Sequence, residues 1–114
     1  MVERPCRGEV YWVRLDPVVG SEQGGTRPAL VVQNDVGNEH APTTIVAPIT
    51  SRLPARDYPF QVRLPDDLLG RSSVVSCSQI RTVAKARLSP ERLAVLPPDL
   101  MRRVDRALAV ALGL

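Results

Sequence analysis

Short apolar runs separated by turn-forming residues are the feature that most limits the folds open to this chain. Each run is about as long as one β-strand, and several of them alternate apolar with polar residues. The sequence shows no alternation of strands with helices and no internal repeat, and helical periodicity gathers towards its end. We therefore predict an α+β fold on a small curled sheet of five to seven short strands. A compact barrel is the expected form, because closure removes exposed strand edges.

The predicted strands differ in how they should be buried. Residues 8–15 alternate, with Val10 and Trp12 on the same face. The run at 28–33 is almost continuously apolar, which predicts a central strand covered on both faces. In the strand at 43–50, Pro48 indicates a bulge or an edge position. Further strands are predicted at 60–64, 73–77 and 78–83, with a single bent strand over 73–83 as the alternative to the last two.

Turn and helix signals fill the remaining segments. Residues 34–42 are dense in turn formers and are predicted to be a loop. Residues 65–70 fit one helical turn closed by glycine. Ser89 followed by Pro90 predicts the start of a short helix that ends before the next proline pair. A final amphipathic helix is predicted from Asp99 to a glycine at 113, and its apolar face comprises Leu100, Val104, Leu108, Ala111 and Leu112.

Length and composition fit one domain over residues 1–114. The chain is 44% hydrophobic, which is enough to build a core without a metal or disulfide. Cys6 and Cys77 are accordingly expected to be free thiols. No apolar stretch reaches the ~20 residues of a membrane span, and the N-terminal residues lack the pattern of a signal peptide. We expect a cytoplasmic protein with no membrane partner.

Several classes of site are excluded by missing motifs. The chain has neither a phosphate-binding GxxxxGK[ST] nor a strand-linked GxGxxG. It has no CxxC pair and only one histidine, His40, which lies in a turn-rich segment. A metal site built from His and Cys, or a Ser-His-Asp arrangement, is therefore not expected. The formal net charge of +3 is compatible with binding to a nucleic acid.

Polar residues at predicted strand ends suggest a phosphate site instead. Glu22 and Arg27 flank a glycine-rich loop, and Thr50 with Ser51 ends another strand. If these ends meet, they form a positive pocket suited to a phosphodiester. RNA supplies its own 2′-hydroxyl nucleophile, so cleavage requires a proton acceptor, a proton donor and a cation rather than a metal. The pattern alone favours ordinary surface roles for Arg27, Glu22 and Thr50, and a role in a site is the alternative.

The sequence resembles the MazF/PemK family of toxins from bacterial toxin–antitoxin modules. The resemblance spans residues 7–114, and its most specific segments are GSEQGGTRP at 20–28 and SQIRT at 78–82. It implies an SH3-like β-barrel with added helices, usually as a homodimer. It also implies metal-independent, cofactor-free cleavage of single-stranded RNA that leaves a 2′,3′-cyclic phosphate and a 5′-hydroxyl. A partner antitoxin with an acidic, partly disordered segment is expected to inhibit the enzyme.

The resemblance also assigns roles to residues. It implies that Arg27 and Thr50 are catalytic and that Glu22 contributes to activity; a role of Glu22 as the base is our hypothesis. Base preference is expected to depend on the segments 51–59 and 70–79. The residues implied to lie near the RNA channel are Ser21, Gln23, Ser51 and Gln79. Arg81, a polar residue of the strand predicted at 78–83, is expected to bind RNA with them.

One function of a different class fits the same fold. CcdB-like toxins resemble this family in fold but bind DNA gyrase without catalysis. The glycine-rich loop with Arg27, together with the strand-end Thr50, favours the nuclease.

Overall fold

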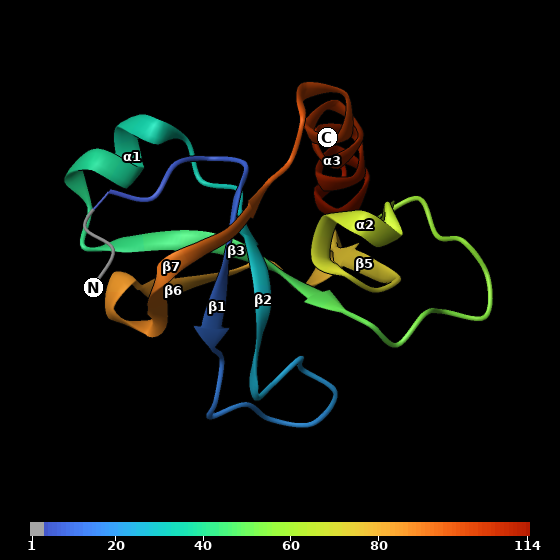
Figure 1. Cartoon of the computed structure of the whole chain (residues 1–114), viewed down its shortest axis with the longest axis horizontal. Helices are drawn as coiled ribbons and strands as arrows, with labels where there is room; N and C mark the ends of the chain where they lie inside the picture. The colour runs from blue at the N-terminus through green and yellow to red at the C-terminus, as the bar shows by residue number, and fades with distance from the viewer. Residues whose placement is uncertain (1–3) are drawn as a thin grey trace.

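The computed structural model describes residues 4–114, which form seven strands, three α-helices and two 3₁₀ turns (Figure 1). The strands are β1 (Glu9–Arg14), β2 (Thr26–Val31), β3 (Thr43–Thr50), β4 (Gln61–Leu64), β5 (Ser73–Ser76), β6 (Arg81–Ala84) and β7 (Leu88–Val95). The helices are α1 (Asp35–His40), α2 (Asp66–Leu69) and α3 (Pro98–Leu112), and the 3₁₀ turns are η1 (Cys77–Gln79) and η2 (Lys85–Arg87). The α+β class predicted from the sequence is confirmed.

The strands form an antiparallel sheet in the order β4-β5-β3-β2-β1-β7, and β6 also pairs with β3. Among the described residues, β4 and β7 end this order and do not pair with each other. The sheet is therefore open, and the expected closed barrel is not confirmed. Along one side of β3, the first half pairs with β6 and the last two residues with β5. The central strand is thus shared between two parts of the sheet.

Pro48 lies at this change of partner. The amide of Val32 donates to the Ile45 carbonyl, so by alternation the backbone nitrogen of Pro48 faces away from β2. On that side the pairing of β3 with β6 extends to Val46, and the pairing of β3 with β5 starts at Ile49. The missing proline N–H therefore removes no ladder bond. Pro48 is not on an edge strand, contrary to one of the two predicted positions.

The central strands are buried on both faces, as predicted for 28–33. One apolar cluster lies between β1, β2, β3, β6 and β7 and includes Tyr11, Val13, Val31 and Val83. The other lies between the opposite face, the β4–β5 pair and α3, and includes Leu30. In Figure 1, α2 and α3 stand on the β5 side of the molecule and α1 on the other. Side-chain alternation along β1 therefore contributes to two separate cores.

The segment 34–42, predicted to be a loop, contains α1. The Asn34 side chain accepts a hydrogen bond from the Gly37 amide at 2.8 Å and caps the helix. Asn38 is fully buried and hydrogen-bonds Thr44 on β3. The loop prediction is wrong because polar contacts, which apolar periodicity does not report, stabilise this helix.

The short helix predicted from Ser89 is also wrong, because residues 88–95 form β7. This strand pairs only with β1, and the register between them shifts twice. An edge strand with irregular pairing accommodates Pro90. Sequence neighbours alone favoured the Ser-Pro helix start, whereas pairing with β1 decides the structure.

The strand predicted at 78–83 is only partly confirmed, because Cys77–Gln79 form η1 and the pairing with β3 that makes β6 starts at Arg81. Most of the remaining elements follow the predictions. Gly70 and Gly113 close α2 and α3 in the left-handed conformation. Leu100 and Val104 are buried under α3 as predicted, whereas Leu112 is exposed at the helix end. Both cysteines are free, Cys6 exposed and Cys77 buried. None of the helices in residues 4–114 is long and apolar enough to cross a membrane.

Candidate functional site

A hollow of about 650 Å³ opens between β1, β2, the end of β3 and the α2 region. It holds three of the residues predicted from the sequence: Arg27, Thr50 and Ser51. Its polar lining also includes Thr26, Arg71 and Ser73, and its apolar lining comprises Trp12, Pro28, Ile49, Leu68, Leu69 and Leu93. We call this cavity the Arg27 hollow. It combines a cationic wall with an apolar one.

Arg27 is positioned by the loop that precedes its own strand. Its Nε donates to the Gly24 carbonyl at 2.8 Å, and its Nη1 donates to Gln23 Oε1. A Cβ at Gly24 would lie 2.7 Å from both Asp16 Oδ1 and Val18 Cγ2, so the close turn requires glycine there. The half-buried guanidinium is thus fixed on one side and keeps further N–H donors for a ligand.

Thr50 is held by the end of β3. It pairs with Val74 of β5, and its Oγ1 accepts a hydrogen bond from the Arg52 amide at 3.1 Å. That bond leaves the hydroxyl proton available for donation. Ser51 follows directly and lines the same hollow. The site therefore has an arginine from β2, a hydroxyl group from the last residue of β3 and a second hydroxyl group from the residue after it.

A second hollow, of about 440 Å³, holds the remaining predicted residues. We call it the Glu22 hollow; it is lined by Ser21, Glu22, Gln23, Ser78, Gln79, Ile80 and Arg81. Glu22 is exposed, and its Oε1 accepts from the Val19 amide at 2.8 Å. Arg81 Nη1 donates to the Leu15 carbonyl at 2.8 Å. These side chains are tied to the loop after β1.

Gln23 connects the two hollows. Its backbone N–H donates to Gln79 Oε1 at 2.7 Å, while its side-chain oxygen accepts from Arg27. The eight residues predicted from the sequence therefore lie in two adjoining cavities rather than in one pocket.

The charge of the two cavities suits an anion. Arg27 and Arg71 line the first, and Arg81 lines the second. Glu22 is the only carboxylate among the residues that line either one. Within residues 4–114 no three His, Cys, Asp or Glu side chains are grouped as metal ligands. The arrangement can hold a phosphate between guanidinium and hydroxyl donors.

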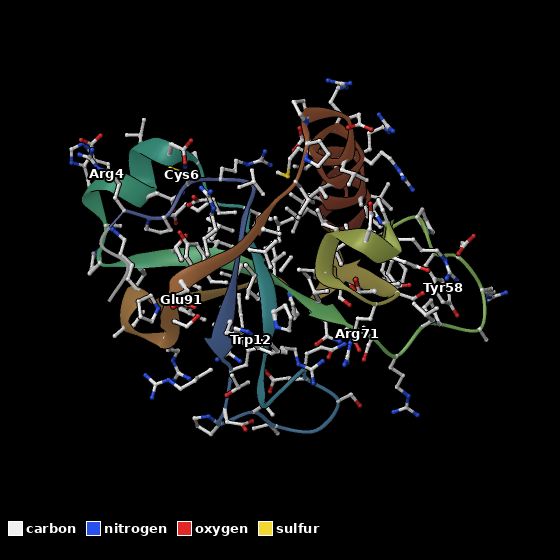
Figure 2. The ribbon with its side chains drawn as sticks, in the orientation of Figure 1. Arg4, Cys6, Trp12, Tyr58, Arg71 and Glu91 are labelled. Carbon is white, nitrogen blue, oxygen red and sulfur yellow. The ribbon has the colours of Figure 1, made fainter. Side chains whose placement is uncertain are left out.

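Sequence reasoning missed several lining residues. Trp12 is 44% exposed at the hollow, and Arg71 follows α2; both are labelled in Figure 2. Ser73 and Leu93 come from β5 and β7. The one available signal was a sole tryptophan on an alternating strand. The others are brought together only by the sheet order, which the sequence does not reveal.

Comparison with known proteins shows a consistent set of relatives. Residues 6–112 match the PemK-like, MazF-like toxins of type II toxin–antitoxin systems. The chain is 46% identical over 110 residues to Endoribonuclease EndoA of Bacillus subtilis (strain 168), covering 95% of this chain and 94% of that protein. It is similar to MazF from Deinococcus radiodurans, with a TM-score of 0.82, 38% identity, and coverage of 96% and 97%. It is also similar to an endoribonuclease in complex with its cognate antitoxin from Mycobacterial species, with a TM-score of 0.79, 29% identity and 96% coverage of both chains.

Proposed function

This chain belongs to the PemK-like, MazF-like toxins of type II toxin–antitoxin systems, and we propose that it cuts single-stranded RNA at the Arg27 hollow. It is an endoribonuclease, like its relative from Bacillus subtilis. The main support for this site is that Arg27, Thr50 and Ser51 line the same cavity. These groups suit a phosphodiester. They come from two separate segments of the chain, the start of β2 and the end of β3 with the residue that follows it.

The proposed reaction is an internal transfer at one phosphate. The 2′-oxygen attacks the adjacent phosphorus and the bond to the 5′-oxygen breaks, which gives a 2′,3′-cyclic phosphate and a 5′-hydroxyl. Arg27 stabilises the charge that develops on the phosphorane and supplies a proton to the departing 5′-oxygen. Thr50 donates a hydrogen bond to a phosphate oxygen and aligns the group for in-line attack. No metal or cofactor enters this scheme.

The proton of the 2′-hydroxyl needs an acceptor, and we assign that role to Glu22. It is the only carboxylate that lines either hollow, and Gln23 beside it binds Arg27. Ser21, Gln23, Ser51, Gln79 and Arg81 are assigned to the path of the RNA strand. In this assignment the substrate crosses from one cavity to the other along the loop that precedes β2 and holds the Arg27 side chain.

The partners and assembly follow from family membership. One structural relative was determined with its cognate antitoxin, and we propose that an antitoxin with an acidic segment inhibits this chain over the same cavities. We also propose a homodimer in the cytoplasm, where its RNA substrate occurs.

The whole chain is one domain, and we regard its open sheet as a coiled form of the SH3-like barrel. Strands β6 and β7, joined by the three-residue η2, enclose one core cluster together with β1, β2 and β3.

The proposal is tested by mapping cut ends on a mixed RNA pool, with and without EDTA. We expect the same cuts in both conditions, with cyclic phosphate and 5′-hydroxyl ends. Arg27→Ala and Thr50→Ala should each lower the cleavage rate about 10²–10³-fold with unchanged folding. Arg102→Ala, on the exposed face of α3, is the matched control for loss of one arginine. Near-wild-type cleavage by either site variant, with the fold intact, contradicts that residue's role.

A further inference from the structure

Ser73 carries a buried hydroxyl group that no neighbouring group satisfies. The residue is 3% exposed, and its Oγ has no hydrogen-bond partner among the described residues. It begins β5, one residue before Val74, which pairs with Thr50. Ser73 also lines the Arg27 hollow. The unpaired hydroxyl is therefore adjacent to the proposed cleavage site.

A purely structural role does not explain this hydroxyl. A buried hydroxyl without a partner weakens the folded state, because its hydrogen bonds to water are lost and not replaced. Alanine would fit the same strand position without that cost. Buried polar groups without a protein partner are uncommon, and a ligand atom is one explanation for them.

The wall around Ser73 indicates what such a ligand is. The apolar lining of the Arg27 hollow includes Trp12 and Leu93, which are 44% and 37% exposed although both are large and apolar. A nucleobase has flat faces that stack on such side chains and a polar edge that forms hydrogen bonds. With the phosphate held by Arg27 and Thr50, the hollow of about 650 Å³ has room for a neighbouring base.

We propose that the Arg27 hollow binds the nucleobase next to the scissile phosphate, and that Ser73 Oγ hydrogen-bonds the edge of that base. Ser73 is then a specificity-determining residue, and Trp12 is the stacking surface. This inference rests on the proposed ribonuclease activity. It adds which position of the RNA is recognised, and by which groups.

The test compares the base preferences of wild type and Ser73→Ala around the cut, mapped on the same mixed RNA pool. We expect discrimination at one position next to the cut to fall about tenfold, while the other positions keep their preference. Ser89→Ala is the matched control, because Ser89 Oγ is also buried without a partner but lines neither hollow. Its cut profile should match that of wild type.

Each outcome separates the two proposals. If wild type cuts no RNA, the proposed function fails. If wild type cuts and Ser73→Ala keeps every preference, or loses rate equally on all sequences, the role of Ser73 is wrong. Urea unfolding should show Ser73→Ala to be at least as stable as wild type, because an unsatisfied hydroxyl has been removed. Should that variant fail to fold, Ser73→Cys, which keeps the shape but is a weak donor, provides the same comparison of profiles.

Discussion

At the scale of single residues, Arg27 shows how local contacts make an arginine at the start of a strand part of a site. Its backbone pairs with Val13 of β1, which fixes the start of β2. Its side chain is then held by Gly24 and Gln23, both from the preceding loop. Sequence pattern alone favoured a surface arginine, because neither of these bonds is encoded by periodicity. The family resemblance supplied the assignment, and the geometry gives it a physical basis.

Cys77 gives a prediction about stability at alkaline pH. Burial raises the pKa of its thiol to about 11, from an ordinary value near 9. Above pH 9 the unfolded thiol loses its proton while the folded one keeps it, so stability is full below pH 9 and falls as pH rises towards 11. We expect this thiol to cost about 2 kcal/mol of unfolding free energy by pH 10.5.

Urea unfolding of wild type and Cys77→Ala between pH 8 and 10.5 measures this loss. The alanine variant lacks the titrating thiol, so the stability gap between the two proteins should shrink as pH rises. Tyr11, whose pKa burial and a hydrogen bond to Glu9 raise to about 12, adds an alkaline loss common to both proteins. A gap that stays constant across this range would show that Cys77 does not titrate between the folded and unfolded states.

At the scale of elements, apolar periodicity predicted the strands and the helix that bury an apolar face. It missed the elements that other contacts stabilise. β1, β3 and α3 were predicted because their apolar residues repeat at strand or helix spacing. α1 was missed because a cap and a buried amide stabilise it, and β7 because its partner β1 lies far away in sequence. The Arg27 hollow was predicted to the same extent. Its arginine and threonine were predicted, but Trp12 was not, because only the order of strands in the sheet brings it to the hollow.

The buried amide of Asn38 predicts how α1 is attached. Its Oδ1 accepts from Thr44 and Gln33, and its Nδ2 donates to the Gln33 carbonyl and to Asp35, at 2.7 to 3.1 Å. Asn38→Ala leaves these partners unsatisfied and should lower the unfolding free energy by about 3 kcal/mol. Asn34→Ala, which removes only the cap, should cost about 1 kcal/mol.

Chemical denaturation compares the two variants directly, and RNA cleavage per folded molecule provides the control. Because α1 lines neither hollow, cleavage by both variants should equal that of wild type wherever they remain folded. Equal stability losses for the two substitutions would mean that Asn38 contributes only as a local helix residue.

At the scale of the whole molecule, the position of the site is fixed by two cores that lie on opposite faces of the same central strands. One cluster is enclosed by β6 and β7, and the other is covered by β4, β5 and α3. The loop before β2 and the end of β3 are anchored to both cores through these strands. Arg27 and Thr50 therefore meet on a rigid frame, although 22 residues separate them in sequence.

The charge gathered on this frame predicts how RNA binding depends on salt. Arg27, Arg71 and Arg81 line the two hollows, and each phosphate contact on a single strand adds about −0.7 to the slope of log affinity against log salt. Three contacts give a slope of about −2, so affinity should fall about 20-fold between 50 and 200 mM salt.

Titration with an RNA carrying a 2′-deoxy group at the mapped cut measures binding without cleavage. Arg71→Ala should reduce the slope to about −1.4, whereas Arg102→Ala on α3 should leave it unchanged. If both variants keep the wild-type slope, Arg71 makes no phosphate contact and the strand does not pass over that wall of the Arg27 hollow.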